Sequence, residues 1–332
     1  MIKFLGLVLC FVILASVGPA QNVTLESGVK AYTSGDHLAS INILKRLTKD
    51  QEDLPEAWYY LGLAYLGAGR PKDSVKPFER SVRQRPDNAD YRASLSYAYL
   101  SVGDRRAENT AKDSLKKASG NELANFVLAV TSLRARSYEV SAQFAKKALD
   151  VSPKFQGALL MRSKALIALF ASEPYPPVRT PEIRVAMLDE AAIRLDTYLK
   201  LDPKADGAKE YASYLNSIRY FADYYRQPGR LNQPRLADEQ ADPTFTPMRI
   251  LRKTAPEYTT SARSAGVEGT SILIVEFRED GTIGHVLVAA PLEDSLDNAA
   301  IEVAKKIKFT PAVRRGKPET NVRRVEYSFG FR

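Results

Sequence analysis

A spaced pattern of aromatic, small and proline residues recurs through the first two thirds of the chain. Its clearest copy consists of Trp58, Leu61, Gly62, Tyr65, Ser74, Phe78, Ser81 and Pro86. Two antiparallel helices meet closely only where Gly, Ala or Ser lies at their crossing, and larger side chains then fill the space beside it. Proline cannot continue a helix, so Pro86 ends the second one. The pattern therefore predicts a stack of helical hairpins.

Other copies flank this one. A weaker copy covers residues 28–47, and later copies cover residues 95–115 and 128–153. The spacing resembles the tetratricopeptide repeat. Because each unit of such an array buries its apolar face against the next unit, an all-α solenoid is expected.

The fifth copy is interrupted. Leu159 to Phe170 supplies its first helix, but four prolines between residues 174 and 181 insert a stiff loop before a helix resumes near Ala191. A tyrosine-rich segment, residues 207–225, then predicts a capping helix, and we interpret its tyrosines as packing residues. Residues 21–226 are thus assigned to the repeat domain.

The end of the chain follows a different period. Apolar runs at residues 270–278 and 283–289 flank Asp280-Gly281, a dipeptide typical of a type I′ hairpin turn. Apolar residues then recur at helical spacing from Leu296 to Ile307, with Asp294 and Ser295 placed to cap the helix. The last strand, Asn321 to Phe329, alternates apolar and polar residues, which predicts one buried and one wet face.

This module also carries a family resemblance. Its ordered motifs are Pro256-Glu257-Tyr258, Ala262-Arg263, Gly266-Val267-Glu268-Gly269, Asp280-Gly281, Leu296-Asp297, Ala299-Ala300, Lys308-Phe309-Thr310-Pro311-Ala312 and Gly316-Lys317-Pro318. In order and spacing they resemble the C-terminal domain of TonB-family energy transducers. The resemblance implies a small β-β-α-β domain of α+β class, here residues 248–332. It also implies a periplasmic location and an extended peptide of an outer-membrane transporter as the partner.

The first 20 residues are typical of a secretory signal peptide. Lys3 precedes an apolar core of about 14 residues, fewer than the roughly 20 that span a bilayer. Cys10, the only cysteine, lies within that core, so the mature chain would contain no disulfide. Retention of the segment as an inner-membrane anchor facing the periplasm is the alternative. Residues 227–247, rich in proline, are predicted to form a flexible linker, after which residues 248–332 should fold alone.

The net charge and the types of side chain present restrict the classes of function that the chain can have. The net charge of +9 is spread through the chain, and for an exported protein of this kind an acidic peptide or an anionic surface is favoured over nucleic acid as the partner. The two histidines, His37 and His285, fall in different domains, and no catalytic or phosphate-binding spacing occurs. We therefore predict a binding protein without enzymatic activity, metal or cofactor.

Two partner-binding surfaces are predicted. The first is the groove of the repeat array, where Asn88, Arg92, Asn125 and Arg162 fall on or near groove-facing positions, although ordinary solvated roles suit them equally well. The second is an open sheet edge. The resemblance places a partner strand beside residues 321–329, where Asn321, Arg323 and Arg324 are the candidate contacts. Pairing of two copies through this strand is a further possibility.

Two functions follow from these features. The first is a periplasmic adaptor that binds one partner in the repeat groove and another by strand addition. The second is an anchored energy transducer that serves an outer-membrane transporter. Family anchors carry a Ser and a His on one helix face, whereas the N-terminal segment has Ser16 but no histidine, and the long proline-rich spacer is absent. These departures favour the adaptor.

Overall fold

The structure, a computed structural model, describes residues 23–173, 177–205, 207–227, 230–231 and 243–330. The predicted signal peptide and most of the predicted linker lie outside the described residues. The chain divides into two compact units, residues 1–104 and 105–332. No helix within the described ranges is long and apolar enough to cross a membrane.

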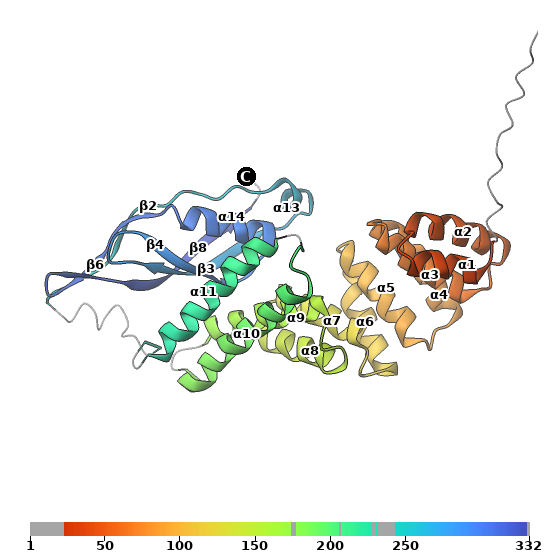
Figure 1. Cartoon of the computed structure of the whole chain (residues 1–332), viewed down its shortest axis with the longest axis horizontal. Coiled ribbons are helices and arrows are strands. Elements are labelled where there is room, and N and C mark those ends of the chain that lie inside the picture. The colour runs from red at the N-terminus through yellow and green to blue at the C-terminus, as the bar shows by residue number, and fades with distance from the viewer. Residues whose placement is uncertain (1–22, 174–176, 206, 228–229, 232–242, 331–332) are drawn as a thin grey trace, which may run out of the picture. The chain divides into compact units, whose positions relative to one another are not determined.

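The first unit is helical. Its helices are α1 (Leu25–Thr33), α2 (His37–Asp50), α3 (Pro55–Gly67), α4 (Pro71–Gln84) and α5 (Ala89–Ser101) (Figure 1). Helices α1 and α2 form one antiparallel pair, and α3 and α4 form the next. Leu44 and Phe78 are fully buried at these crossings. The crossings need small residues, as the repeat pattern predicted.

Gly62 shows how tight one crossing is. A Cβ atom at this position would lie 2.7 Å from the Phe78 ring, closer than real contacts allow. Gly62→Leu should therefore force α3 and α4 apart and lower the free energy of unfolding by about 1–3 kcal/mol or more. Gly120→Leu is the matched control, because its Cβ would meet only Val151, at 3.8 Å. Equal urea midpoints for the two variants would contradict the assigned crossing.

The second unit begins with six helices. They are α6 (Arg106–Lys117), α7 (Glu122–Arg134), α8 (Tyr138–Val151), α9 (Gln156–Ala171), α10 (Pro181–Leu201) and α11 (Ala208–Arg226). Helix α10 begins at Pro181, well before the predicted resumption near Ala191, because Thr180 caps it by accepting a hydrogen bond from the backbone N–H of Ile183. Helix α11 packs against α10 at the end of the array.

A small α+β domain follows in the same unit. Its main sheet has the order β4-β3-β8, formed by β3 (Gly269–Phe277), β4 (Ile283–Ala290) and β8 (Asn321–Phe329), with α14 (Asp294–Ala304) between β4 and β8 in sequence. This arrangement confirms the predicted fold class, an all-α repeat array followed by a β-β-α-β domain. The shorter elements are β1 (Phe245–Thr246), β2 (Arg249–Arg252), α13 (Thr260–Ser264), β5 (Lys308–Thr310), β6 (Ala312–Arg314) and β7 (Lys317–Glu319). Strand β1 lies within the segment predicted as a linker and pairs with β6.

Two local predictions were wrong in detail. The β3–β4 hairpin forms as predicted, but only Gly281 of its Asp280-Gly281 pair has positive φ, so the turn is not type I′. Asp280 instead accepts hydrogen bonds from the backbone and hydroxyl of Thr282, which stabilises the longer loop. The cap of α14 is Glu293, not Asp294 or Ser295, since its carboxylate accepts from the backbone of Ser295 and Leu296.

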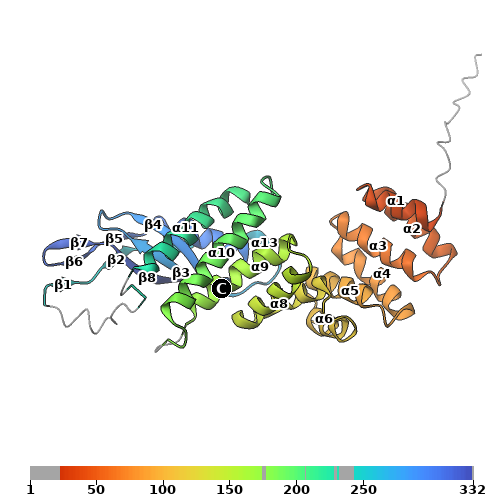
Figure 2. The same cartoon turned by 60° about the horizontal axis from the view of Figure 1, so that its bottom comes forward.

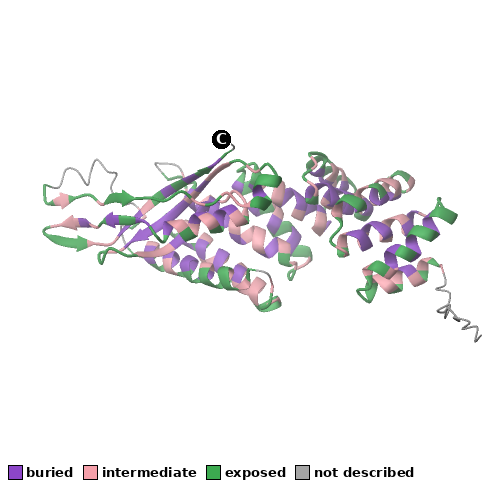
Figure 3. Ribbon diagram, turned by 90° about the horizontal axis from the view of Figure 1, so that it is seen from above, coloured by how far each residue is buried: buried purple, intermediate pink, exposed green. Residues whose placement is uncertain are grey.

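The main sheet is covered on both faces. On one face, Leu273, Val325 and Tyr327 share a core with Leu296 of α14. On the other, four buried side chains pack against the repeat helices: Ile274, Leu287, Ala289 and Val322. Helices α9 and α11 both contact β4, and Figure 2 shows α11 lying along the sheet. The three strands are accordingly buried along most of their length (Figure 3).

Candidate partner-binding surfaces

Strand β8 lies at an edge of the main sheet. It pairs with β3 over its full length, from Asn321 opposite Phe277 to Phe329 opposite Gly269. Within the described ranges no strand pairs with its other side. Such an edge presents backbone groups that can accept a further strand.

One contact identifies the outward-facing backbone groups of β8. The carbonyl of Glu326 accepts a hydrogen bond of 2.8 Å from the ammonium of Lys253. Because the pattern alternates along an antiparallel strand, the outward groups belong to residues 322, 324, 326 and 328.

Lys253 partly covers this edge, a role that nothing in the sequence indicated. Its ammonium also lies 4.8 Å from the centroid of the Tyr327 ring. Lys253 is exposed, so its side chain can leave without disturbing the core. A lysine held over a strand edge deters unspecific pairing, while a better-matched strand can displace it.

The three predicted contacts on β8 have different environments. Asn321 is buried, and its side-chain oxygen has no hydrogen-bond partner among the residues described. Arg323 lies on the face of α14 and is half-buried, whereas Arg324 lies on the opposite face and donates to the carbonyl of Ala171, the last residue of α9. The two arginines thus flank the strand from opposite sides.

In the first unit, Asn88 and Arg92 support the start of α5. The side chain of Asn88 caps the helix by accepting from the backbone N–H of Tyr91 at 3.0 Å. Arg92 donates to the carbonyl of Pro86 in the preceding turn. A cavity of about 850 Å³, lined by residues of α2, α3 and α4, lies elsewhere in this unit and is rich in lysine and arginine.

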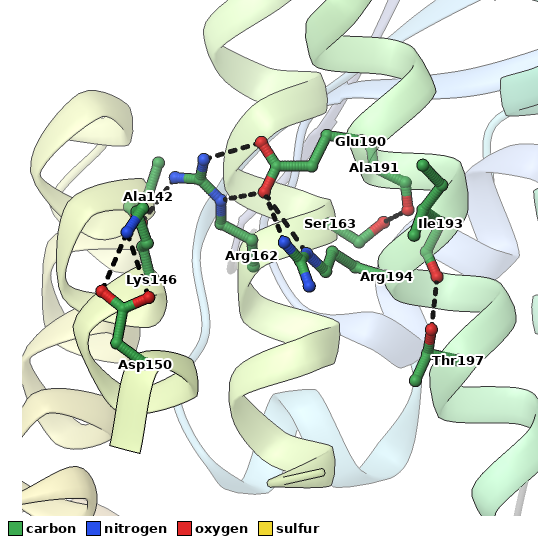
Figure 4. A network of polar contacts seen from close by, with 10 residues as sticks. All are labelled: Ala142, Lys146, Asp150, Arg162, Ser163, Glu190, Ala191, Ile193, Arg194 and Thr197. Carbon is green, nitrogen blue, oxygen red and sulfur yellow. Dashed lines mark hydrogen bonds and ion pairs between the residues drawn. The ribbon is translucent and has the colours of Figure 1, made fainter. Parts of the chain in front are cut away.

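In the second unit, Asn125 and Arg162 hold parts of the array together. Asn125 is fully buried and donates to the carbonyl groups of Ser119 and Asn121 before α7. Arg162 makes a two-pronged ion pair with Glu190 of α10, at 3.0 and 2.8 Å, and donates to the carbonyl of Ala142 on α8 (Figure 4). Burial opposes the charge on Glu190, yet the hydrogen bonds from Arg162 hold the pKa of Glu190 below its usual value. The contacts of Arg162 fix the spacing of three successive helices.

Polar contacts accompany the apolar packing between α11 and the sheet. The hydroxyl of Tyr214 accepts from the backbone N–H of Val288 at 3.2 Å, and Tyr220 donates to the carboxylate of Glu276 at 2.5 Å. The His285 ring stacks on Tyr220 with centroids 4.2 Å apart. Burial lowers the pKa of His285, so the ring is held neutral to a lower pH than usual. The predicted packing role of the α11 tyrosines fits these contacts.

A second polar cluster joins the repeat helices to α14. Lys164 of α9 pairs with Asp294, and the hydroxyl of Tyr211 donates to the same carboxylate at 3.0 Å. Asp297 beside it is buried, which raises its pKa to about 7, although the hydroxyl of Ser271 donates to it at 2.6 Å. Together with the α11 contacts, this cluster makes the sheet domain part of one packed unit with the end of the array.

The described residues contain no group of three or more side chains placed to hold a metal ion. What they do present is a helical-repeat array and a small sheet domain with a free strand edge. This combination defines a class of protein–protein interaction modules.

Comparisons with known families agree with this class. Residues 254–331 match the family described as Gram-negative bacterial TonB protein C-terminal, and residues 25–89 match the tetratricopeptide repeat. The chain is therefore a tetratricopeptide repeat array fused to a TonB C-terminal domain, as its sequence motifs predicted. No curated protein matches it.

Several solved structures are similar to part of the chain. A thermophilic tetratricopeptide repeat protein of Thermus thermophilus, TTC0263, is 19% identical and covers 58% of this chain and 98% of its own, with a TM-score of 0.44. MamA is 18% identical over 53% of this chain and 95% of its own, with a TM-score of 0.40. YrrB, described as a repeat protein with an unusual peptide-binding site, is 11% identical over 56% of this chain and 88% of its own, with a TM-score of 0.38.

Proposed function

We propose that this protein is a periplasmic adaptor that captures an extended peptide as a new strand beside β8. The outer edge of β8, with which no described strand pairs, is the observation that carries the proposal. Residues 322, 324, 326 and 328 turn their backbone groups to that edge. Each hydrogen bond gained there contributes about 0.5–1.5 kcal/mol, so a short peptide segment can bind with useful affinity.

The incoming strand must first displace Lys253 from the carbonyl of Glu326. Because the ammonium is exposed, water replaces its lost hydrogen bond at little cost. Val325 and Tyr327 face the core of α14, so they hold β8 in place and leave its backbone to the partner. Titration with extended peptides tests this step when the amide resonances of β8 are monitored. Unchanged chemical shifts of the β8 amides would contradict it.

The repeat array supplies the second proposed surface. Asn88 and Arg92 remain the proposed groove contacts of the first unit, where both also support α5. Asn125 and Arg162 hold helices of the second unit at their spacing. We therefore propose that their main role is to maintain the shape of the groove, and that direct contact with a ligand is secondary. A second copy of the chain is another occupant for the β8 edge, and the measured mass in solution distinguishes it from a peptide partner.

An anchored energy transducer is the alternative function, favoured by the family match of residues 254–331. In that case the captured peptide would belong to an outer-membrane transporter, and the N-terminal segment would stay in the inner membrane. The two functions differ in the fate of residues 1–20.

The adaptor function predicts that the mature chain begins near Gln21 and is recovered in the soluble periplasmic fraction. The short apolar core and the small residues Gly18, Pro19 and Ala20 suit cleavage by a signal peptidase. Intact-mass measurement on protein from the native envelope checks this. A membrane-bound chain that retains Met1 would instead support the transducer.

A further inference from the structure

A small cavity of about 230 Å³ lies between the repeat helices and the edge strand β8. Its walls come from α9, α10, α11 and the segment after α11, together with β3 and β8. Four of its ten lining residues are arginines: Arg184, Arg230, Arg323 and Arg324. The other lining residues are apolar or aromatic, and none of the described residues that line it is acidic.

Arg184 of α10 is a half-buried cation at this cavity. Its guanidinium carbon lies 5.1 Å from the centroid of the Phe170 ring. Its Nε atom is buried and has no hydrogen-bond partner among the residues described. Burial lowers the pKa of Arg184, and the nearby charge of Arg324 lowers it further. Two like charges are therefore held close together at the cavity.

The acid that acts most strongly on Arg184 is already engaged. Glu173 accepts hydrogen bonds from the backbone of Val178, at 2.7 Å, and from the guanidinium of Arg179, at 3.0 Å. Glu173 attracts Arg184 only through longer-range electrostatics. Arg184 is thus a half-buried guanidinium with an unpaired N–H donor, and a second guanidinium lies nearby. Such an environment favours the binding of an anion in the cavity.

The cavity also borders β8. Arg323 and Arg324 leave the strand on opposite faces, yet both line the same cavity. The cavity thus borders β8 beside residue 324, one of those whose backbone groups turn to the outer edge of the strand. That is where the captured peptide would lie.

We propose that Arg184 and Arg324 bind a carboxylate carried by the extended peptide that pairs with β8. This inference rests on the proposed function. A cavity of about 230 Å³ is smaller than the roughly 300–1,000 Å³ of pockets for drug-sized ligands, and it suits one acidic side chain or a chain terminus. Guanidinium groups bind carboxylates in a two-pronged geometry, which gives the peptide a fixed register along the strand.

Sodium sulfate probes the site itself. On titration of the full chain at constant ionic strength, we expect saturable shifts of the Nε–Hε resonances of Arg184 and Arg324. Arg184→Gln should weaken sulfate binding about tenfold or more, because hydrogen bonds to a charged group are worth about 1.5–3 kcal/mol. Arg184→Lys should restore part of it, and Arg252→Gln, which removes an exposed charge from β2, should change nothing. Non-saturable shifts, or equal binding by Arg184→Gln, would overturn the site.

A display library of random octapeptides, selected on the full chain, tests the peptide as the source of the anion. We expect Asp or Glu to be enriched at one position of the peptides that shift β8 amides, with the enrichment lost on Arg184→Gln and kept on Arg252→Gln. Peptides that shift β8 without a fixed acid would overturn this inference and leave strand addition intact. If sulfate binds but no peptide shifts the β8 amides, strand addition is overturned. A bound peptide is then also overturned as the source of the carboxylate.

Discussion

A fragment of residues 248–332 should unfold at a much lower urea concentration than a fragment of residues 105–332. The shorter fragment lacks the helices that cover one face of the main sheet. Ile274 and Leu287, 5% and 0% exposed in the structure, would then face water. Burying a large aliphatic side chain contributes about 1.5–3 kcal/mol, so these two alone account for about 3–6 kcal/mol. That is a large part of the roughly 5–15 kcal/mol that holds a typical domain together.

A single substitution tests the same packing without removing helices. Leu287→Ala in the 105–332 fragment should lower the free energy of unfolding by about 2–5 kcal/mol, because it leaves a cavity between β4 and the repeat helices. Leu251→Ala is the matched control, since Leu251 of β2 is 61% exposed. Equal urea midpoints for the two fragments, and no change in the free energy of unfolding on Leu287→Ala, would show that the stability of the sheet does not depend on the helices.

The repeat helices cover the second face of the main sheet, and this packing was not predicted from the sequence. Alternation along β8 predicted one wet face, and Arg324, Glu326 and Ser328 do carry polar side chains there. In β3 and β4, however, apolar residues occupy both parities, as in Leu273 beside Ile274, and Leu287 beside Val288. Such runs are typical of strands buried on both sides. That pattern was the available signal that the repeat array and the sheet would pack together.

Local chemistry decided the other differences. Positive φ at two successive turn residues occurs at Arg315 and Gly316, between β6 and β7, and not at Asp280. The side chain of Asp280 bonds to Thr282, which favours a different loop. The motifs that mark each family are local in sequence, so the two kinds of fold could be predicted from them. The neighbours of Arg324 on α9 and α10 come from segments more than 100 residues away, so only the folded chain could show them.

Proline at position 326 should weaken peptide capture about tenfold to a hundredfold. Glu326→Pro removes a backbone donor that faces the open edge, and its ring hinders the neighbouring strand. Loss of two hydrogen bonds at about 0.5–1.5 kcal/mol each gives a reduction of this order. Glu326→Ala is the control, because it removes the exposed side chain and leaves the backbone donor in place.

Titration calorimetry with a selected peptide measures this effect, and circular dichroism verifies that the Glu326→Pro variant remains folded. Proline at Val325 or Tyr327 would be uninformative, since both side chains lie in the core shared with α14. Equal affinities for Glu326→Pro and Glu326→Ala would mean that the peptide does not pair with the β8 backbone.

The most direct test of strand addition follows backbone amide resonances while the 105–332 fragment is titrated with extended peptides from candidate outer-membrane partners. Strand addition predicts the largest shifts, with slowed hydrogen exchange, at residues 322, 324, 326 and 328, and smaller changes at Lys253 as it leaves the carbonyl of Glu326. Shifts confined to α14, with the amides of β8 unchanged, would contradict it.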